Sequence, residues 1–112
     1  MLHTKWADVF AGLVLGSLLA SPAQALASDQ TTQDLYKERC QKCHGADGKA
    51  DTPAGKKLEA HDFHSEEVTK MTDAEWIKVT TDGKKKMPAF KEKLSADEIK
   101  SLIAYIRQLS KK

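Results

Sequence analysis

The stretch Cys40-Gln41-Lys42-Cys43-His44 decides how this chain folds, because it commits three ligand-binding side chains to one short segment. In an α-helix, side chains at positions i, i+3 and i+4 lie on the same face. Cys40, Cys43 and His44 have this spacing. We therefore expect the segment to be helical and to present two thiols and one imidazole together to a single flat ligand.

This spacing is typical of covalent haem attachment, in which the two thiols form thioethers with the haem vinyl groups and the imidazole binds the iron. Three other interpretations are open. A thioredoxin-like redox pair would need a βαβ pattern, which the sequence lacks. A zinc site could combine Cys40, Cys43, His61 and His64, although their spacing fits zinc fingers poorly. A five-residue motif can also occur by chance. The prediction is one covalent haem c on Cys40 and Cys43, with His44 as an iron ligand.

Residues 1–27 are predicted to be a secretory signal peptide. Two basic residues precede an apolar run over residues 9–20, and two small-residue cleavage patterns follow it, so the mature chain would begin at Leu26 or Ser28. The run is shorter than the roughly 20 residues of a membrane span. An uncleaved N-terminal anchor is the alternative. We expect residues 28–112 to form one domain without a membrane span, in the periplasm or another extracytoplasmic compartment.

The composition of the chain describes a small and nearly neutral domain. The sequence is 40% hydrophobic and 30% charged, and its formal net charge is +2. Loss of residues 1–27 removes one basic and one acidic residue, so the net charge stays at +2. This balance predicts binding to neither nucleic acid nor membranes. A domain of this size has a modest core, which a buried cofactor would supplement.

The spacing of apolar residues and capping residues predicts an all-α fold of several short helices. Ser95 and Glu98 form a capping box before an apolar stripe, and Thr72 and Glu75 form another. The expected elements are a helix from Thr31 to His44, a loop over residues 46–57, a short turn capped by Ser65, a helix from Thr72 to about Gly83, and a helix from Ala96 to Leu109.

Several segments that follow one another in order carry a resemblance to a known family. They are Tyr36 four residues before Cys40, the run Cys43-His44-Gly45-Ala46-Asp47-Gly48, the segment from Gly83 to Phe90 that contains Met87-Pro88, and the ending Ala104-Tyr105-Ile106-Arg107. In these features residues 31–110 resemble a class I cytochrome c of the short bacterial or photosynthetic type. The resemblance implies helices packed around one haem, with the first and last helices crossing near Tyr36 and Tyr105.

The resemblance also implies that Met87 provides the second axial ligand of the iron. Its place in a loop between Gly83 and Pro88 agrees with this role, since such a loop can hold a side chain toward the haem. Met71, His61 and His64 are the alternative ligands, and Met87 could instead be an ordinary core methionine.

Two further roles come from the resemblance alone. Pro53 resembles the family proline whose carbonyl accepts the second ring N–H of the axial histidine, although a turn proline is the simpler interpretation. Trp76 resembles an aromatic residue packed at the haem edge, and a plain core tryptophan would serve the fold equally well.

Occupation of both axial positions by His44 and Met87 leaves the iron no open site, which favours one-electron transfer over enzymatic chemistry. We therefore expect a monomeric, soluble electron carrier with a redox protein as donor and another as acceptor. Lys84, Lys85 and Lys86 would form a positive patch that steers acidic partners, or simply a solvated charged run. The alternatives are an electron-transfer subunit of a dehydrogenase or oxidase complex, and a haem peroxidase or sensor.

Overall fold

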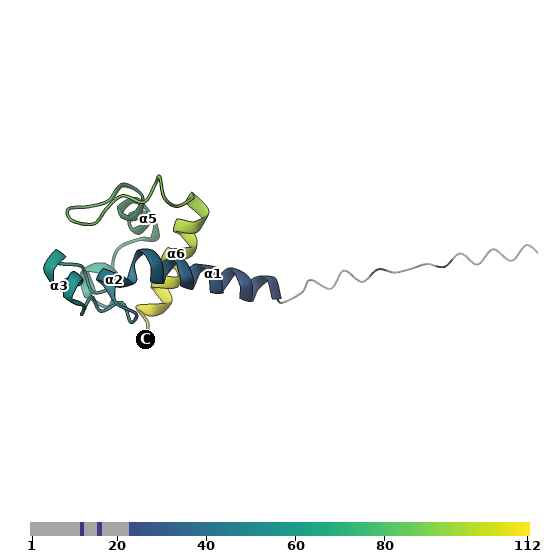
Figure 1. The fold of residues 1–112 in the computed structure, drawn as a ribbon, viewed down its shortest axis with the longest axis horizontal. Coiled ribbons are helices and arrows are strands. Elements are labelled where there is room, and N and C mark those ends of the chain that lie inside the picture. The colour runs from purple at the N-terminus through teal and green to yellow at the C-terminus, as the bar shows by residue number, and fades with distance from the viewer. Residues whose placement is uncertain (1–11, 13–15, 17–22) are drawn as a thin grey trace, which may run out of the picture.

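The structure is a computed structural model that describes residues 12, 16 and 23–112 of the chain. The predicted signal peptide, residues 1–27, lies mostly outside the described residues. The described part contains six helices, α1 (Ala23–Arg39), α2 (Gln41–His44), α3 (Pro53–Leu58), α4 (Glu66–Thr69), α5 (Asp73–Asp82) and α6 (Ala96–Leu109) (Figure 1). It contains no strand, and no helix in it is long and apolar enough to cross a membrane. The predicted all-α fold is confirmed.

The first helix differs from the prediction at both ends. It begins at Ala23, so Thr31 lies inside it and is not its N-cap. The good helix formers at positions 23–27 account for the earlier start. At its other end the backbone leaves helical geometry at Cys40, with φ −121° and ψ −38°, and helix resumes as α2 from Gln41. The haem motif therefore spans a bend between two helices, and the expected continuous helix is wrong.

Residues 46–57 were expected to be a loop, and the structure places helix α3 at the end of this segment. The Thr52 hydroxyl accepts a hydrogen bond from the amide of Gly55, and Pro53 occupies the first position of the helix. A threonine N-cap followed by proline is a favourable helix start. The loop prediction therefore holds for the first part of the segment and is wrong for residues 53–57, which belong to α3.

The remaining helices agree with the capping signals. Ser65 caps α4, and the capping boxes of Thr72 with Glu75 and of Ser95 with Glu98 are both formed. Helix α5 stops at Gly83, whose φ is +77°. The bounds of α6 match the predicted range of Ala96 to Leu109.

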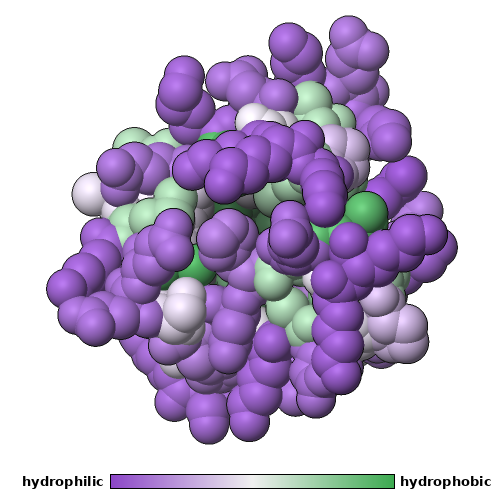
Figure 2. Space-filling model, turned by 90° about the vertical axis from the view of Figure 1, so that its left-hand side faces the viewer, coloured by the Kyte–Doolittle hydropathy of each residue, from purple (hydrophilic) through white to green (hydrophobic). Residues whose placement is uncertain are grey.

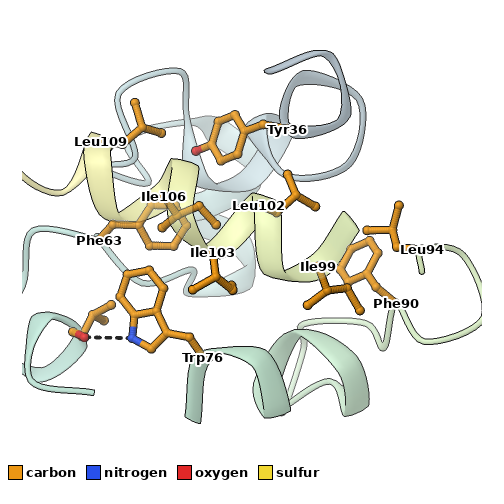
Figure 3. Packing of buried hydrophobic residues seen from close by; sticks show 11 residues of the cluster. Tyr36, Phe63, Trp76, Phe90, Leu94, Ile99, Leu102, Ile103, Ile106 and Leu109 are labelled. Carbon is orange, nitrogen blue, oxygen red and sulfur yellow. Dashed lines mark hydrogen bonds between the residues drawn. The ribbon is translucent and has the colours of Figure 1, made fainter. Parts of the chain in front are cut away.

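Helix α6 provides the centre of the hydrophobic core. Figure 3 shows Tyr36 on one side of this helix and Trp76 on the other. Side chains from α6 and its neighbours are buried together; they are Tyr36, Phe63, Val68, Trp76, Phe90, Leu94, Ile99, Leu102, Ile103, Ile106 and Leu109. The apolar stripe predicted for the last helix is thus the core of the domain.

Helices α1 and α6 cross and pack against each other (Figure 1). The rings of Tyr36 and Tyr105 meet there with centroids 5.2 Å apart. The buried Tyr36 hydroxyl donates a hydrogen bond of 2.7 Å to the carbonyl of Gly45, just beyond α2. This tyrosine therefore joins the helix crossing to the end of the haem motif, and the predicted crossing is confirmed.

Candidate cofactor site

Two adjoining cavities bring the predicted site residues together. The larger, of about 500 Å³, is lined by Cys40, Cys43, His44 and Met87 among others. The smaller, of about 100 Å³, shares Cys40, His44 and Met87 with it and reaches inward to the core. Figure 2 views the molecule from the left-hand side of Figure 1 and shows apolar surface in hollows between hydrophilic side chains. Residues more than forty positions apart in sequence thus line the same cavities.

The imidazole of His44 is held by two contacts. Its Nδ1 lies 3.1 Å from the carbonyl oxygen of His61, and the ring stacks on Phe63 with centroids 4.4 Å apart and an interplanar angle of 20°. Burial lowers the pKa of His44 below its ordinary value, which the hydrogen bond to His61 partly opposes. A neutral imidazole that donates from Nδ1 to a carbonyl leaves Nε2 as a metal ligand.

The family resemblance implied that the carbonyl of Pro53 accepts the hydrogen bond from this ring nitrogen, and that prediction is wrong. The acceptor is the carbonyl of His61, and Pro53 serves as the first residue of α3. A carbonyl acceptor of this kind is provided by whichever backbone segment folds over the histidine. Sequence spacing from His44 alone could not indicate that segment, because it is reached only after α3.

Thr52 is a positioning residue that the sequence analysis missed. Its hydroxyl lies 2.8 Å from the carbonyl of Lys42 and 3.1 Å from that of Cys43, at the end of α2. Nearby, a Cβ added to Gly55 would lie 2.3 Å from the Cys43 carbonyl oxygen, so only glycine allows this approach of α3 to α2. The sequence signal that could have identified Thr52 was the pair Thr52-Pro53, which is typical of a helix start.

The two cysteines are free thiols, partly buried, in the described structure. Burial, and then the neighbouring Cys43, raises the pKa of Cys40 to about 11. A zinc site would need these thiols grouped with histidines. Within residues 12, 16 and 23–112 no group of three or more His, Cys, Asp or Glu side chains can hold a metal ion. His64 instead pairs with Asp62 at 2.8 Å, so the zinc interpretation is wrong.

Met87 is held on a tightly turned loop. Its amide donates to the carbonyl of Lys84 at 2.9 Å, and its carbonyl accepts from the Lys84 amide at 3.1 Å. Lys85, between them, has a positive φ of 53°. Met87 lines both cavities, whereas Met71 lines only the smaller one. The loop therefore brings the Met87 thioether to the space where Cys40 and His44 already lie.

Trp76 forms part of the wall of the smaller cavity. It is buried, its ring lies 5.8 Å from that of Phe63, and its Nε1 donates to the carbonyl of Val68 at 3.0 Å. A buried indole N–H with a hydrogen-bond partner carries no desolvation penalty. Trp76 is thus both a core residue and a cavity residue, as either interpretation of the sequence allowed.

Basic side chains line the larger cavity at its outer edge. Arg39, Lys84, Lys85 and Lys86 all contribute to it, and Lys86 pairs with Glu59 of the α3 C-cap at 3.2 Å. The charged run that precedes Met87 in sequence therefore lies beside the site. Lys93 lies over the ring of Phe90, 5.9 Å from its centroid.

The donor set and the walls fit a haem. Two thiols, one imidazole and one thioether line the larger cavity, and most of the other side chains lining the smaller cavity are apolar, among them Phe63, Val68 and Leu102. Thiols spaced for two vinyl groups, together with nitrogen and sulfur ligands, are the donors used in c-type cytochromes. The fold and the site together define a haem domain of the c type, which transfers electrons.

Comparison with known proteins agrees with this class. Residues 27–106 match the family model of cytochrome c oxidase, cbb3-type, subunit III. The solved KustC0563 c-type cytochrome is 35% identical, with 70% of this chain and 95% of that chain covered and a TM-score of 0.64. A mutant of KustC0563, with one tyrosine replaced by phenylalanine, is 34% identical over 70% of this chain and 96% of that one, with a TM-score of 0.63. No curated protein matches. The chain belongs to the cbb3-type subunit III family of cytochrome c domains.

Proposed function

We propose that this protein is a single-haem, one-electron carrier that works outside the cytoplasm. The observation that carries the proposal is the convergence of Cys40, Cys43, His44 and Met87 on one cavity. Cys40 and Cys43 would hold the haem as thioethers, and His44 and Met87 would be its two axial ligands. Thioethers form on motifs of this kind outside the cytoplasm, which agrees with the proposal that the chain is exported.

When bound, haem supplies an iron that alternates between the Fe(II) and Fe(III) states. The residues around it favour rapid and reversible exchange of one electron. His44 is oriented by the His61 carbonyl and the Phe63 ring, and Met87 by its bridged loop. A soft, neutral thioether favours Fe(II), and apolar walls disfavour the more highly charged oxidised centre. We therefore expect a relatively positive reduction potential.

The basic edge of the larger cavity supports a docking role. Arg39, Lys84 and Lys85 lie beside the proposed haem position and would attract acidic redox partners over a distance of about one Debye length, roughly 8–10 Å. Lys85→Glu should slow electron transfer to an acidic partner and should weaken its dependence on salt. Lys100→Glu, an exposed lysine on α6, is the matched control for the same change in net charge. Rates that do not respond to salt in the unmodified protein would remove the docking proposal.

A second candidate is a fixed electron-transfer subunit of an oxidase, with the same haem chemistry. The family description, which names an oxidase subunit, is the observation that favours it. Gel filtration of native extract separates the two. A free carrier elutes as a monomer below the 12.4 kDa mass of its precursor, because the signal peptide has been removed, whereas a subunit elutes with a complex.

Covalent attachment is tested by extraction of the exported protein with acidified acetone. Haem held through Cys40 and Cys43 stays with the protein, and a double Cys→Ser variant loses it. Met87→Ala is the control, because it should keep the covalent haem and lose only the sulfur-to-iron charge-transfer band. Haem that is fully extractable from the unmodified protein would contradict the proposal.

A further inference from the structure

Arg107 of α6 makes more polar contacts than its place in a final helical turn requires. Its Nε donates to Asp73 Oδ1 at 2.8 Å, Nη1 lies 3.4 Å from the carbonyl of Thr69, and Nη2 donates to the carbonyl of Met71. Its Cζ also lies over the ring of Trp76, 4.1 Å from the centroid. One guanidinium thus joins α6 to the α4–α5 connection and to α5, 34 to 38 positions away in sequence.

Two of the four residues that Arg107 contacts lie in the wall of the smaller cavity. Met71 and Trp76 line that cavity, as does Val68, whose carbonyl accepts the Trp76 indole N–H. Ile106, the neighbour of Arg107 on α6, lines it as well. Arg107 does not line the cavity itself, so any influence on a cofactor passes through these residues.

The chemistry of this contact requires a guanidinium. Three donors in one plane reach a carboxylate and two carbonyls while the same plane stacks on an indole ring. A lysine would keep the positive charge at the C-terminal end of α6 but could not make this set of contacts. The Arg107 side chain is 23% exposed and that of Asp73 is 70% exposed, so the guanidinium is largely shielded from water while the carboxylate is not.

We propose that Arg107 is a positioning residue that holds the wall of Val68, Met71 and Trp76 closed against α6. This inference rests on the proposed function, and it gives Arg107 control over how much water reaches the haem. An open wall admits water, and water stabilises the more highly charged oxidised state. Loss of the clamp should therefore lower the reduction potential, even when the positive charge is kept.

The test compares the haem-loaded protein with three variants, Arg107→Lys, Arg107→Gln and the exposed α6 control Lys100→Gln. Two properties are measured, the reduction potential and amide hydrogen exchange over residues 68–73. Both Arg107 variants should have a lower potential than the unmodified protein, and the segment should exchange about tenfold faster or more, as expected for a lost charged hydrogen bond. The Lys100 control should change neither property.

Two results would overturn the proposal. If Arg107→Lys keeps the unmodified potential while Arg107→Gln lowers it, the residue acts by charge and not by position. If both variants keep the unmodified potential, with or without faster exchange, the residue is purely structural. If the Arg107→Gln protein does not accumulate, the reduction potential of the Arg107→Lys protein alone decides whether the proposal holds. Absence of haem from the unmodified protein would defeat the proposed function, while the exchange comparison would still test the clamp.

Discussion

Replacement of Gly83 by alanine should disturb the Met87 loop, because the added methyl group would collide with the backbone of residues 87–89. Gly83 has φ +77° and ψ +166°, a backbone region that is populated essentially by glycine and costs an L-residue about 1–3 kcal/mol. The added Cβ would also lie 2.8 Å from both the Ala89 nitrogen and the Met87 carbonyl oxygen. These are backbone atoms, which cannot rotate away, and such overpacking costs about 1–3 kcal/mol.

Together the two effects predict a loss of about 2–6 kcal/mol of unfolding free energy for Gly83→Ala, a large part of the stability of a small domain. Because Met87 must move to relieve the collision, its bond to iron should weaken as well. Urea unfolding of the haem-loaded protein measures the first effect. The intensity of the sulfur-to-iron charge-transfer band measures the second.

Gly45→Ala is the matched control, since Gly45 also has a positive φ, of +80°. Its added Cβ would meet only the flexible Asp47 side chain, at 3.1 Å. Gly45→Ala should cost only the free energy of this unfavourable backbone conformation, about 1–3 kcal/mol, and should leave the charge-transfer band intact. If Gly83→Ala is no less stable than Gly45→Ala and keeps the full band, the reasoning about the Met87 loop is refuted.

Three further predictions concern the His44 side of the site. Tyr36→Phe removes the hydrogen bond to the Gly45 carbonyl and should lower the urea unfolding free energy by about 1–2 kcal/mol; an unchanged midpoint would contradict it. Thr52→Ala removes the α3 cap and the contacts to α2, and should cost about 1–2 kcal/mol, whereas Thr52→Ser should restore most of it. Burial lowers the pKa of His44, so below pH 6.5 the unfolded chain takes up a proton before the folded chain does. The stability of the haem-free protein should therefore fall as the pH decreases from 6.5, and His44→Gln should flatten that dependence.

The helices that could be predicted closely from the sequence are those with strong local signals. Both ends of α6 could be predicted from the capping box of Ser95 with Glu98 and from the uninterrupted apolar stripe, because capping and periodicity are properties of neighbouring residues. The same applies to Thr72 with Glu75 at the start of α5. The local spacing also predicted that Cys40, Cys43 and His44 come together, and all three line the larger cavity.

What could not be predicted depends on contacts between distant segments. The bend at Cys40 is one such feature, and the His61 carbonyl beside His44 is another. Neither follows from periodicity, since the first interrupts a helical pattern and the second needs the path of the chain after α3. Pro53 carried a strong local signal, but as a helix start, and the family resemblance gave it a different role.

The most direct test of the central claim, a closed site with His44 and Met87 as axial ligands, is an anaerobic redox titration of the exported protein followed by addition of carbon monoxide. If His44 and Met87 fill both axial positions, the protein should have a positive reduction potential, a charge-transfer band from sulfur to iron in the oxidised state, and a reduced spectrum that carbon monoxide leaves unchanged. A reduced spectrum that shifts on addition of carbon monoxide, or a clearly negative potential, would contradict it.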